Sequence, residues 1–466
     1  MTDRDLSALS RLRRAVVAPF AAPIAAGGGV FAAILLGVLA TALAGPAARA
    51  QNPLEITVAG AEFEPVPIAL LAFEPGTPAL AAQAAEISAV LEGNLERSGL
   101  FRLISPDAFL STRLPFDTAP AYQDWRTIGA DALVTGRIDR LPDGRIAVQF
   151  RVFDTVAESQ IEAMQLLGDP ASLRRTGHQV SDRVYTALTG ESAYFDSQVV
   201  FVDETGPKGA RRKRLAIMDQ DGANLRFLPT RSDIVLTPRV SPDNRSVLYI
   251  SYDTGQPQIL IMDVASGTRA RLGDFPGMSF APRWSPDGTE VVLSLSQDGN
   301  TDLYALSVGN RRLRRLTQNP AIDTAPSFAP DGSRIVFESD RGGSQQLYVM
   351  DRSGGPATRI SFGDGRYGTP VWSPKGDLIA FTKILRGRFH IGVMRPDGSA
   401  ERLLTTSFLD EGPSFSPNGR VLAFYRESPG QQGRAQVMSV DVTGRNLRTM
   451  PTPNAASDPA WGALRQ

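Results

Sequence analysis

The sequence of 466 residues contains no cysteine and only two histidines. Without cysteine the chain forms no disulfide, and it lacks the residue on which a bacterial lipoprotein is acylated. His178 and His390 stand in no recognisable metal-ligand motif, so we assign structural roles to both. Asp219-Gln-Asp221-Gly-Ala-Asn224 begins like a calcium loop but has no closing glutamate. We therefore expect no metal and no cofactor.

Sequence motifs for catalysis are equally scarce. There is no Gly-x-Ser-x-Gly nucleophile turn, and no phosphate-binding or dinucleotide-binding loop outside the first 50 residues. The sequence therefore predicts no catalytic residue and a protein that is not an enzyme.

The chain also has no excess of charge of either sign, because 49 Lys and Arg residues balance 49 Asp and Glu residues. Residues 1–50 hold five Arg and two Asp, a net charge of +3, so the remainder carries 0 − 3 = −3. This weakly acidic balance argues against nucleic acid as a partner.

The first 50 residues have the pattern of an export signal. Arg4, Arg11, Arg13 and Arg14 precede an apolar run over 30–44, and Ala48-Arg-Ala50 is a small-x-small cleavage motif that places the mature start at Gln51. A retained membrane anchor is the alternative. No other long apolar run follows, so after signal removal we expect no membrane span and a location in an extracytoplasmic space; the periplasm is the location that the family resemblance described below implies.

One short motif recurs along the C-terminal half. Its copies begin at Pro238, Pro282, Pro326, Pro370 and Pro413, and a truncated copy begins at Pro459. A period of 40–45 residues with strand-like content is typical of a β-propeller blade. Each copy predicts four strands, and an aromatic or valine two residues after each proline predicts packing between blades.

The repeat count predicts how the ring closes. Three strands between residues 198 and 228 precede the first full copy, while the copy at Pro459 has an innermost strand without partners. Joined, they complete a sixth blade and remove an open sheet edge. The predicted fold class is α+β multidomain, with an N-terminal α/β domain and a six-bladed β-propeller over 194–466 closed by the C-terminal strand.

Residues 67–190 predict the α/β domain. Strands are expected at 67–73, 101–104, 132–136, 146–152 and 159–167, and helices at 79–97, 122–128 and 170–188, the last ended by Gly190. Residues 51–66 alternate like a strand at Leu54, Ile56 and Val58. This segment is either a strand that pairs with another sheet or a frayed terminus.

The stretches before the innermost strands converge on one mouth of the channel. They vary between copies while the frame repeats, and they mix Met, Phe, Tyr, Thr and acidic residues. Such variable loops on a repeating scaffold are typical of a protein-binding face.

The whole arrangement resembles the TolB family, the periplasmic component of the Tol–Pal system. The local resemblance lies in Pro67-Ile-Ala-Leu-Leu-Ala-Phe73, Ile128-Gly-Ala-Asp-Ala-Leu-Val-Thr-Gly136, His178-Gln-Val-Ser-Asp182 and Phe408-Leu-Asp-Glu411. It implies a non-enzymatic monomer that binds the peptidoglycan-associated lipoprotein Pal and TolA. It also implies support of outer-membrane integrity and envelope constriction during cell division, with other outer-membrane or peptidoglycan-associated proteins as further partners.

The resemblance also implies two sets of binding residues. The Pal-binding face falls on Thr237, Met278, Ser279, Ala281, Asp323, Thr324, Tyr367, Thr369, Asp410 and Glu411. The TolA-binding segment, within residues 51–66, falls on Leu54, Glu55, Ile56, Thr57, Val58, Glu62 and Phe63. The alternatives are an extracytoplasmic propeller enzyme, such as a lyase or hydrolase, and a glycan-binding scaffold.

Overall fold

The computed structural model of the chain describes residues 64–465, except residues 112, 113, 232 and 276. The expected export signal, its cleavage point between Ala50 and Gln51, and the segment Leu54–Phe63 lie outside the described residues. None of the described helices combines the length and apolar character needed to cross a membrane.

The N-terminal domain is a mixed sheet packed on helices. The strands are β1 (Val66–Leu70), β2 (Glu74–Pro75), β3 (Phe101–Leu103), β4 (Ala132–Arg140), β5 (Ile146–Asp154) and β6 (Ser159–Gly168). The helices are α2 (Ala81–Ser98), α3 (Tyr122–Thr127) and α4 (Leu173–Thr189), with 3-10 turns η1 (Pro78–Leu80), η2 (Pro106–Ala108) and η3 (Pro170–Ser172). The order is β3-β1-β4-β5-β6, with β2 beside β4. Strand β1 runs parallel to β3 and β4, and the remaining long pairs are antiparallel.

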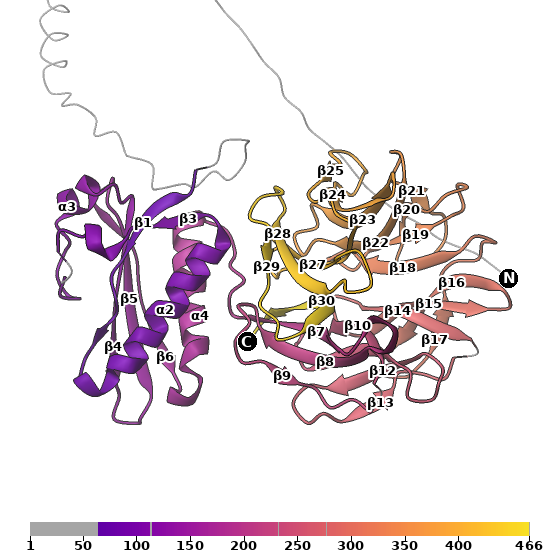
Figure 1. Cartoon of the computed structure of the whole chain (residues 1–466), viewed down its shortest axis with the longest axis horizontal. Coiled ribbons are helices and arrows are strands. Elements are labelled where there is room, and N and C mark those ends of the chain that lie inside the picture. Colours follow the sequence, from indigo (N-terminus) through magenta and orange to yellow (C-terminus); the bar gives the residue numbers. More distant parts are fainter. Residues whose placement is uncertain (1–63, 112–113, 232, 276, 466) are drawn as a thin grey trace, which may run out of the picture. The chain divides into compact units, whose positions relative to one another are not determined.

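Helices α2 and α4 pack on the sheet and on each other (Figure 1). Their buried residues, such as Leu91 and Val184, share one core with Ile68 of β1 and Val148 of β5. The helices approach closely at Gly177, where an added Cβ would lie 3.0 Å from Val90. Helix α4 ends before Gly190, as the sequence predicted, and Gly190 adopts the left-handed conformation with φ of 68° that is common after a helix end.

The C-terminal part contains six four-stranded sheets arranged as propeller blades (Figure 1). The innermost strands are β10 (Val235–Val240), β14 (Met278–Trp284), β18 (Asp323–Phe328), β22 (Arg366–Trp372), β26 (Leu409–Phe415) and β30 (Ala455–Leu464). The second strands are β11 (Ser246–Ser251), β15 (Glu290–Gln297), β19 (Arg334–Ser339), β23 (Ile379–Leu385), β27 (Val421–Glu427) and β7 (Ser197–Thr205).

The outer half of each blade completes the four-strand pattern. The third strands are β12 (Gln258–Asp263), β16 (Asn300–Ser307), β20 (Gln346–Asp351), β24 (Arg388–Met394), β28 (Ala435–Asp441) and β8 (Arg212–Asp219, after η4, Lys208–Ala210). The outermost strands are β13 (Arg269–Arg271), β17 (Leu313–Arg315), β21 (Thr358–Arg359), β25 (Arg402–Leu403), β29 (Arg448–Thr449) and β9 (Arg226–Phe227). The last sheet has the order β30-β7-β8-β9, which confirms the predicted closure by the C-terminal strand.

The recurring proline lies in a β-bulge of each innermost strand. The pairing register shifts there in all six blades. The residue before the proline has positive φ in every copy, at Thr237, Ala281, Ala325, Thr369, Gly412 and Asp458. A proline has no N–H to lose from the ladder at a bulge, so the motif marks the point where each strand bends at the channel.

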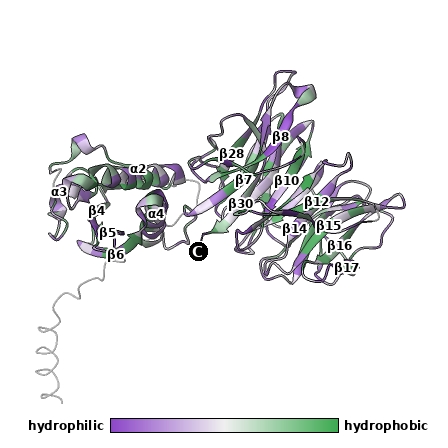
Figure 2. Cartoon of the chain, turned by 90° about the horizontal axis from the view of Figure 1, so that it is seen from below, coloured by the Kyte–Doolittle hydropathy of each residue, from purple (hydrophilic) through white to green (hydrophobic). Residues whose placement is uncertain are grey.

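The aromatic residue two places after the proline packs between blades, as predicted. Phe328 shares a cluster with Val292 and Leu303 of the preceding blade, and Trp372 shares one with Val336 and Leu347. In Figure 2 hydrophobic residues (green) follow the strands of the blades, while many connections are hydrophilic (purple). Adjacent blades therefore contact each other through apolar side chains, and the repeat places one of these side chains at the same position in each blade.

Candidate functional site

The variable loops lie at one end of the propeller channel because all six lead into innermost strands at the same end. Four of them present a large exposed hydrophobic side chain. These are Ile234, Met278, Ile322 and Phe408, with exposed fractions of 45, 53, 53 and 46%. Ile234, Met278 and Ile322 each precede the recurring proline by four positions and Phe408 by five. Apolar side chains on corresponding loops of four blades form a rim of the kind that protein partners cover. We call these four residues the apolar rim.

The predicted face residues differ in accessibility. Met278 belongs to the apolar rim, and the half-buried members are Thr237, Ala281, Thr324, Thr369 and Glu411. The buried members are Ser279, Asp323, Tyr367 and Asp410. The structure thus brings the predicted set to one mouth, but four of its members have no surface to offer a partner in this conformation.

Two of these buried acids support the loops. Both oxygens of Asp323 accept hydrogen bonds from Arg341 Nη2, at 2.9 and 2.8 Å. Asp410 accepts two hydrogen bonds of 2.7 Å from Arg426. The Arg426–Asp410 pair is bidentate, with two nitrogens on two oxygens, and such pairs have a narrow geometry. Both arginines therefore hold the start of an innermost strand in place behind the rim.

Two further carboxylates, Glu338 and Asp458, lie near Glu411 in the same part of the channel. Burial raises the pKa of all three, and repulsion adds to the rise, from Glu411 at Glu338 and from Asp458 at Glu411. Glu338 accepts hydrogen bonds from Thr324 Oγ1 at 2.5 Å and Thr369 N at 2.8 Å. Sequence reasoning missed Glu338. Its signal is a lone acid inside the apolar run Ile335-Val-Phe-Glu-Ser.

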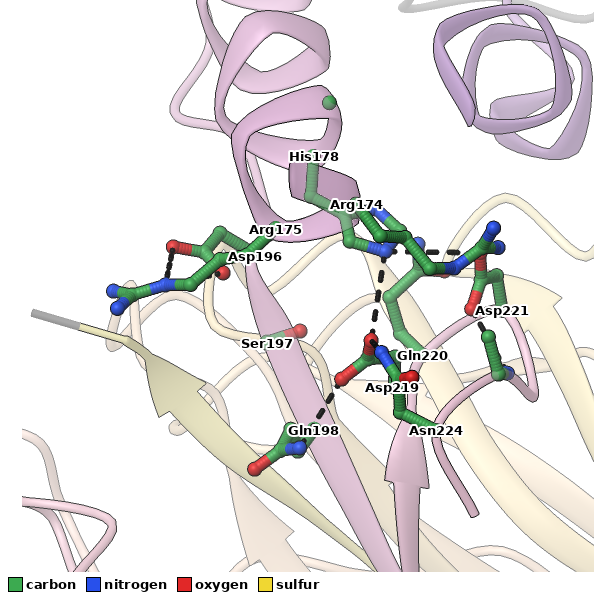
Figure 3. A network of polar contacts seen from close by, with 12 residues as sticks. Arg174, Arg175, His178, Asp196, Ser197, Gln198, Asp219, Gln220, Asp221 and Asn224 are labelled. Carbon is green, nitrogen blue, oxygen red and sulfur yellow. Dashed lines mark hydrogen bonds and ion pairs between the residues drawn. The ribbon is translucent and has the colours of Figure 1, made fainter. Parts of the chain in front are cut away.

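A second polar cluster links the two domains through their side chains (Figure 3). Asn94 of α2 accepts hydrogen bonds at Oδ1 from Gln220 Nε2 and Arg97 Nη2, both at 2.8 Å. Its Nδ2 must therefore donate, to His178 Nδ1 at 2.9 Å and Ser181 Oγ at 2.8 Å. Because His178 Nδ1 accepts, the neutral ring carries its proton on Nε2.

His178 Nε2 points toward two carboxylates without bonding to either. It lies 3.8 Å from Asp219 Oδ2 and 3.7 Å from Asp221 Oδ2, and the side chain is fully buried. Burial is the main reason why the pKa of His178 falls to about 4. Protonation would also require a hydrogen on Nδ1, where Asn94 already donates. The histidine is thus held neutral at the domain junction.

His178, Asp219 and Asp221 have the residue types of a metal site, but their surroundings do not suit a cation. Metal binding at Nε2 would move the ring proton to Nδ1, against the Asn94 amide. Asn224 donates to Asp219 Oδ2 at 2.6 Å, and Arg465 and Gln198 donate to Oδ1, each at 3.1 Å.

The oxygens of Asp221 are occupied in the same way. Oδ2 pairs with Arg174, and Oδ1 accepts from Ala223 N at 3.1 Å. The positive charges around the cluster therefore already neutralise its acids, and we assign the cluster to the joint between domains. The sequence showed both partners, the Asp219-Gln-Asp221 turn and His178, but not their contact.

Known proteins match this chain over most of its length. The family model described as TolB beta propeller domain matches residues 185–465, and the TolB amino-terminal domain matches residues 54–161. A Tol-Pal system protein TolB from Paramagnetospirillum magneticum is 56% identical over 419 residues, which are 89% of this chain and 94% of that protein. The protein of the same name from Dinoroseobacter shibae is 56% identical over 437 residues, 93% of this chain and 98% of that protein.

A solved structure has the same architecture. The crystal structure of TolB from Acinetobacter baumannii matches with a TM-score of 0.75 at 29% identity, covering 86% of this chain and 97% of that chain. The likeness therefore extends over both domains.

Proposed function

Because this chain belongs to the TolB family of Tol-Pal system proteins, we propose that it is a non-enzymatic component of the Tol–Pal system in the periplasm. It would support outer-membrane integrity and envelope constriction by binding two proteins of that system. The family assignment supports the system, and the surface features below support the two contacts.

The first contact is with Pal at the channel mouth. The observation that carries it is the apolar rim, because four exposed hydrophobic side chains at equivalent loops are unusual on a surface that stays in water. The half-buried Thr324 and Glu411 provide polar groups beside the rim. Apolar anchors surrounded by polar groups are the usual composition of an interface.

Substitution at the rim tests this contact. Met278→Glu should weaken Pal binding at least about tenfold, because a charge would be desolvated without a partner at the centre of the contact. Phe408→Glu, on another blade, should act in the same direction. Leu403→Glu is the matched control, since Leu403 is 40% exposed but lies on the outermost strand β25.

Titration calorimetry with purified Pal measures the three affinities, and circular dichroism checks the fold of each variant. If Met278→Glu and Phe408→Glu both bind Pal as tightly as Leu403→Glu, the rim is not the Pal site.

The second contact is with TolA through the mature N-terminus. The support is the alternation at Leu54, Ile56 and Val58 followed by Glu64-Pro-Val-Pro67, a sequence that disfavours a helix and predicts an extended segment. An extended strand at a free end can add to the sheet of a partner. Deletion of residues 51–63 should then abolish TolA binding and leave Pal binding within a few fold of the parent protein.

Calorimetry with TolA, with and without saturating Pal, also measures coupling between the two contacts. If one partner changes the affinity of the other, linkage requires an equal and reciprocal effect. Equal TolA affinity in the parent and the deleted protein would show that the segment is only a terminus.

A further inference from the structure

Two arginines occupy the same place in adjacent blades of the channel. Arg239 of β10 and Arg283 of β14 each follow the recurring proline, where the other blades carry Ser327, Val371, Ser414 and Ala460. Both arginines line one cavity of about 320 Å³ on the side of the bulges away from the apolar rim. The repeat therefore offers this position six times, and this chain fills it with a positive charge twice in succession.

Neither guanidinium has a carboxylate partner. Among the described residues, no ion pair within 4.0 Å involves Arg239 or Arg283. Arg239 Nη1 donates only to the carbonyl of Pro238, at 2.6 Å, and its Nε is buried without a hydrogen-bond partner. Both arginines are half-buried, and charges withdrawn from water in proteins are normally paired.

The electrostatics show two cations that repel each other. Burial lowers the pKa of both groups, and for Arg283 the repulsion from Arg239 lowers it further. Asp458 partly offsets the effect at Arg239 but not at Arg283. A cation would add to this repulsion, whereas an anion would relieve it.

Two other blades that line the cavity supply neutral donors, Ser327 on β18 next to the Arg283 blade and Ser414 on β26. Ser327 Oγ accepts from Trp372 N at 3.2 Å, and Ser414 Oγ accepts from Trp461 N at 2.9 Å. With those acceptor positions used, each hydroxyl proton remains available to a ligand in the cavity, which both serines line. Two guanidiniums and two hydroxyls thus offer donors to the same space.

We propose that Arg239 and Arg283 form an anion-binding site in the propeller channel that takes a phosphoryl or similar tetrahedral oxyanion. Arginine suits this class of ligand because its planar fork donates two parallel hydrogen bonds to two oxygens. The cavity has room for inorganic phosphate with water around it. The inference is independent of the proposed contacts with Pal and TolA, since it uses neither the rim nor the N-terminal segment.

Thermal unfolding of the intact protein in inorganic phosphate tests the proposal. Sodium chloride holds the ionic strength constant, so that general screening does not change between samples. A ligand that binds only the folded state raises the melting temperature as its concentration rises. We expect this rise in the parent protein, and a loss of phosphate affinity of about tenfold or more in Arg239→Gln and Arg283→Gln, since each removes a charge-assisted pair of bonds.

A second readout separates the site from a merely structural role. In chloride alone, Arg283→Gln should melt higher than the parent because it removes a half-buried charge that Arg239 repels. Arg283→Lys keeps the charge but loses the fork, so it should fold and bind phosphate more weakly. Arg312→Gln, on an exposed turn between β16 and β17, is the matched control and should respond like the parent.

The outcomes are decisive in both directions. If chloride stabilises the parent as well as phosphate does, or if the double variant at Arg239 and Arg283 keeps the full phosphate response, the proposal is overturned. Glycerol 3-phosphate identifies the source of the ligand. A response to it shows that phosphate esters enter the cavity, and a response to inorganic phosphate alone restricts the site to the free anion.

Discussion

Trp461 on the closing strand packs against the hydrophobic cores of the N-terminal domain and of the propeller. Its replacement by alanine should destabilise the protein by about 3 kcal/mol. The indole is half-buried. It meets Tyr194 edge-on at 5.9 Å between ring centroids, and its Nε1 donates to Ser197 Oγ at 2.8 Å. The expected loss lies at the lower end of the range for Trp→Ala because part of the ring is exposed.

The expected shift in melting temperature follows from the size of the propeller. With an unfolding entropy of about 2.1 cal/mol/K per residue over roughly 270 residues, 3 kcal/mol corresponds to a fall of about 5 °C. Scanning calorimetry measures this shift. Hydrogen exchange at the backbone amides of Phe195 and Ser197 reports separately on the junction between the domains.

Trp372→Ala is the matched control for Trp461→Ala. Trp372 occupies the same repeat position, but it packs between two complete blades, and its Nε1 donates to Gly376 O at 3.3 Å. We expect a similar or larger fall in melting temperature without loss of protection at Phe195. An unchanged melting temperature in Trp461→Ala, or equal loss of protection in both variants, would refute this account of the closure.

Three other outcomes are expected. Deleting Pro459–Gln466 should open the ring and expose the edge of β7, so calorimetry should show a loss of several kcal/mol; an unchanged melting temperature would contradict the closure. Gly177→Ala brings two opposed effects, because the new Cβ lies 3.0 Å from Val90 and overpacking costs about 1–3 kcal/mol, whereas alanine is favoured over glycine inside a helix by about 1 kcal/mol. We expect a net loss of up to about 2 kcal/mol in urea unfolding, and a variant more stable than the parent would show that Val90 moves aside. The pKa of His178 is about 4 in the folded protein and about 6.5 in the unfolded chain, so the unfolded chain takes up the proton first as the pH falls. The neutral His178 therefore contributes fully to the free energy of unfolding above pH 6.5, and up to about 3 kcal/mol of that free energy is lost as the pH falls toward 4. Burial raises the pKa of Asp182 to about 7, which gives the opposite trend in the same window. The measurement is therefore the difference between the parent and His178→Gln, and a difference that does not change with pH would refute the assignment.

The sequence predicted the propeller because its period is visible without any knowledge of contacts. The copies starting at Pro238, Pro282 and Pro326 are 44 residues apart, and each contains strand patterns that pair locally. Because strands of one blade pair locally, the single strand at Pro459 and the three strands between residues 198 and 228 could be predicted to complete one blade. The elements of the N-terminal domain were predicted from their periodicity, with ends that differ by a few residues, as at α4.

The candidate sites were harder to predict because their residues meet only after distant segments fold. Asp323 and Asp410 were expected at the binding face, whereas the structure turns them inward to Arg341 and Arg426. Nothing in the local pattern distinguishes an acid that faces a partner from one that braces a loop. That difference depends on whether an arginine on the neighbouring strand, such as Arg426, or just after it, such as Arg341, reaches the acid.

By itself, the sequence determined the number of blades, the strand that closes the ring and the end of the channel where the variable loops meet. These features follow from periodicity, which is a property of neighbouring residues along the chain. Only the tertiary structure decided that Asn94 and Asp219 enclose His178, and that Arg239 and Arg283 line one cavity without an ion-pair partner among the described residues. Burial and charge balance depend on which distant side chains share a space, and the fold alone brings those side chains together.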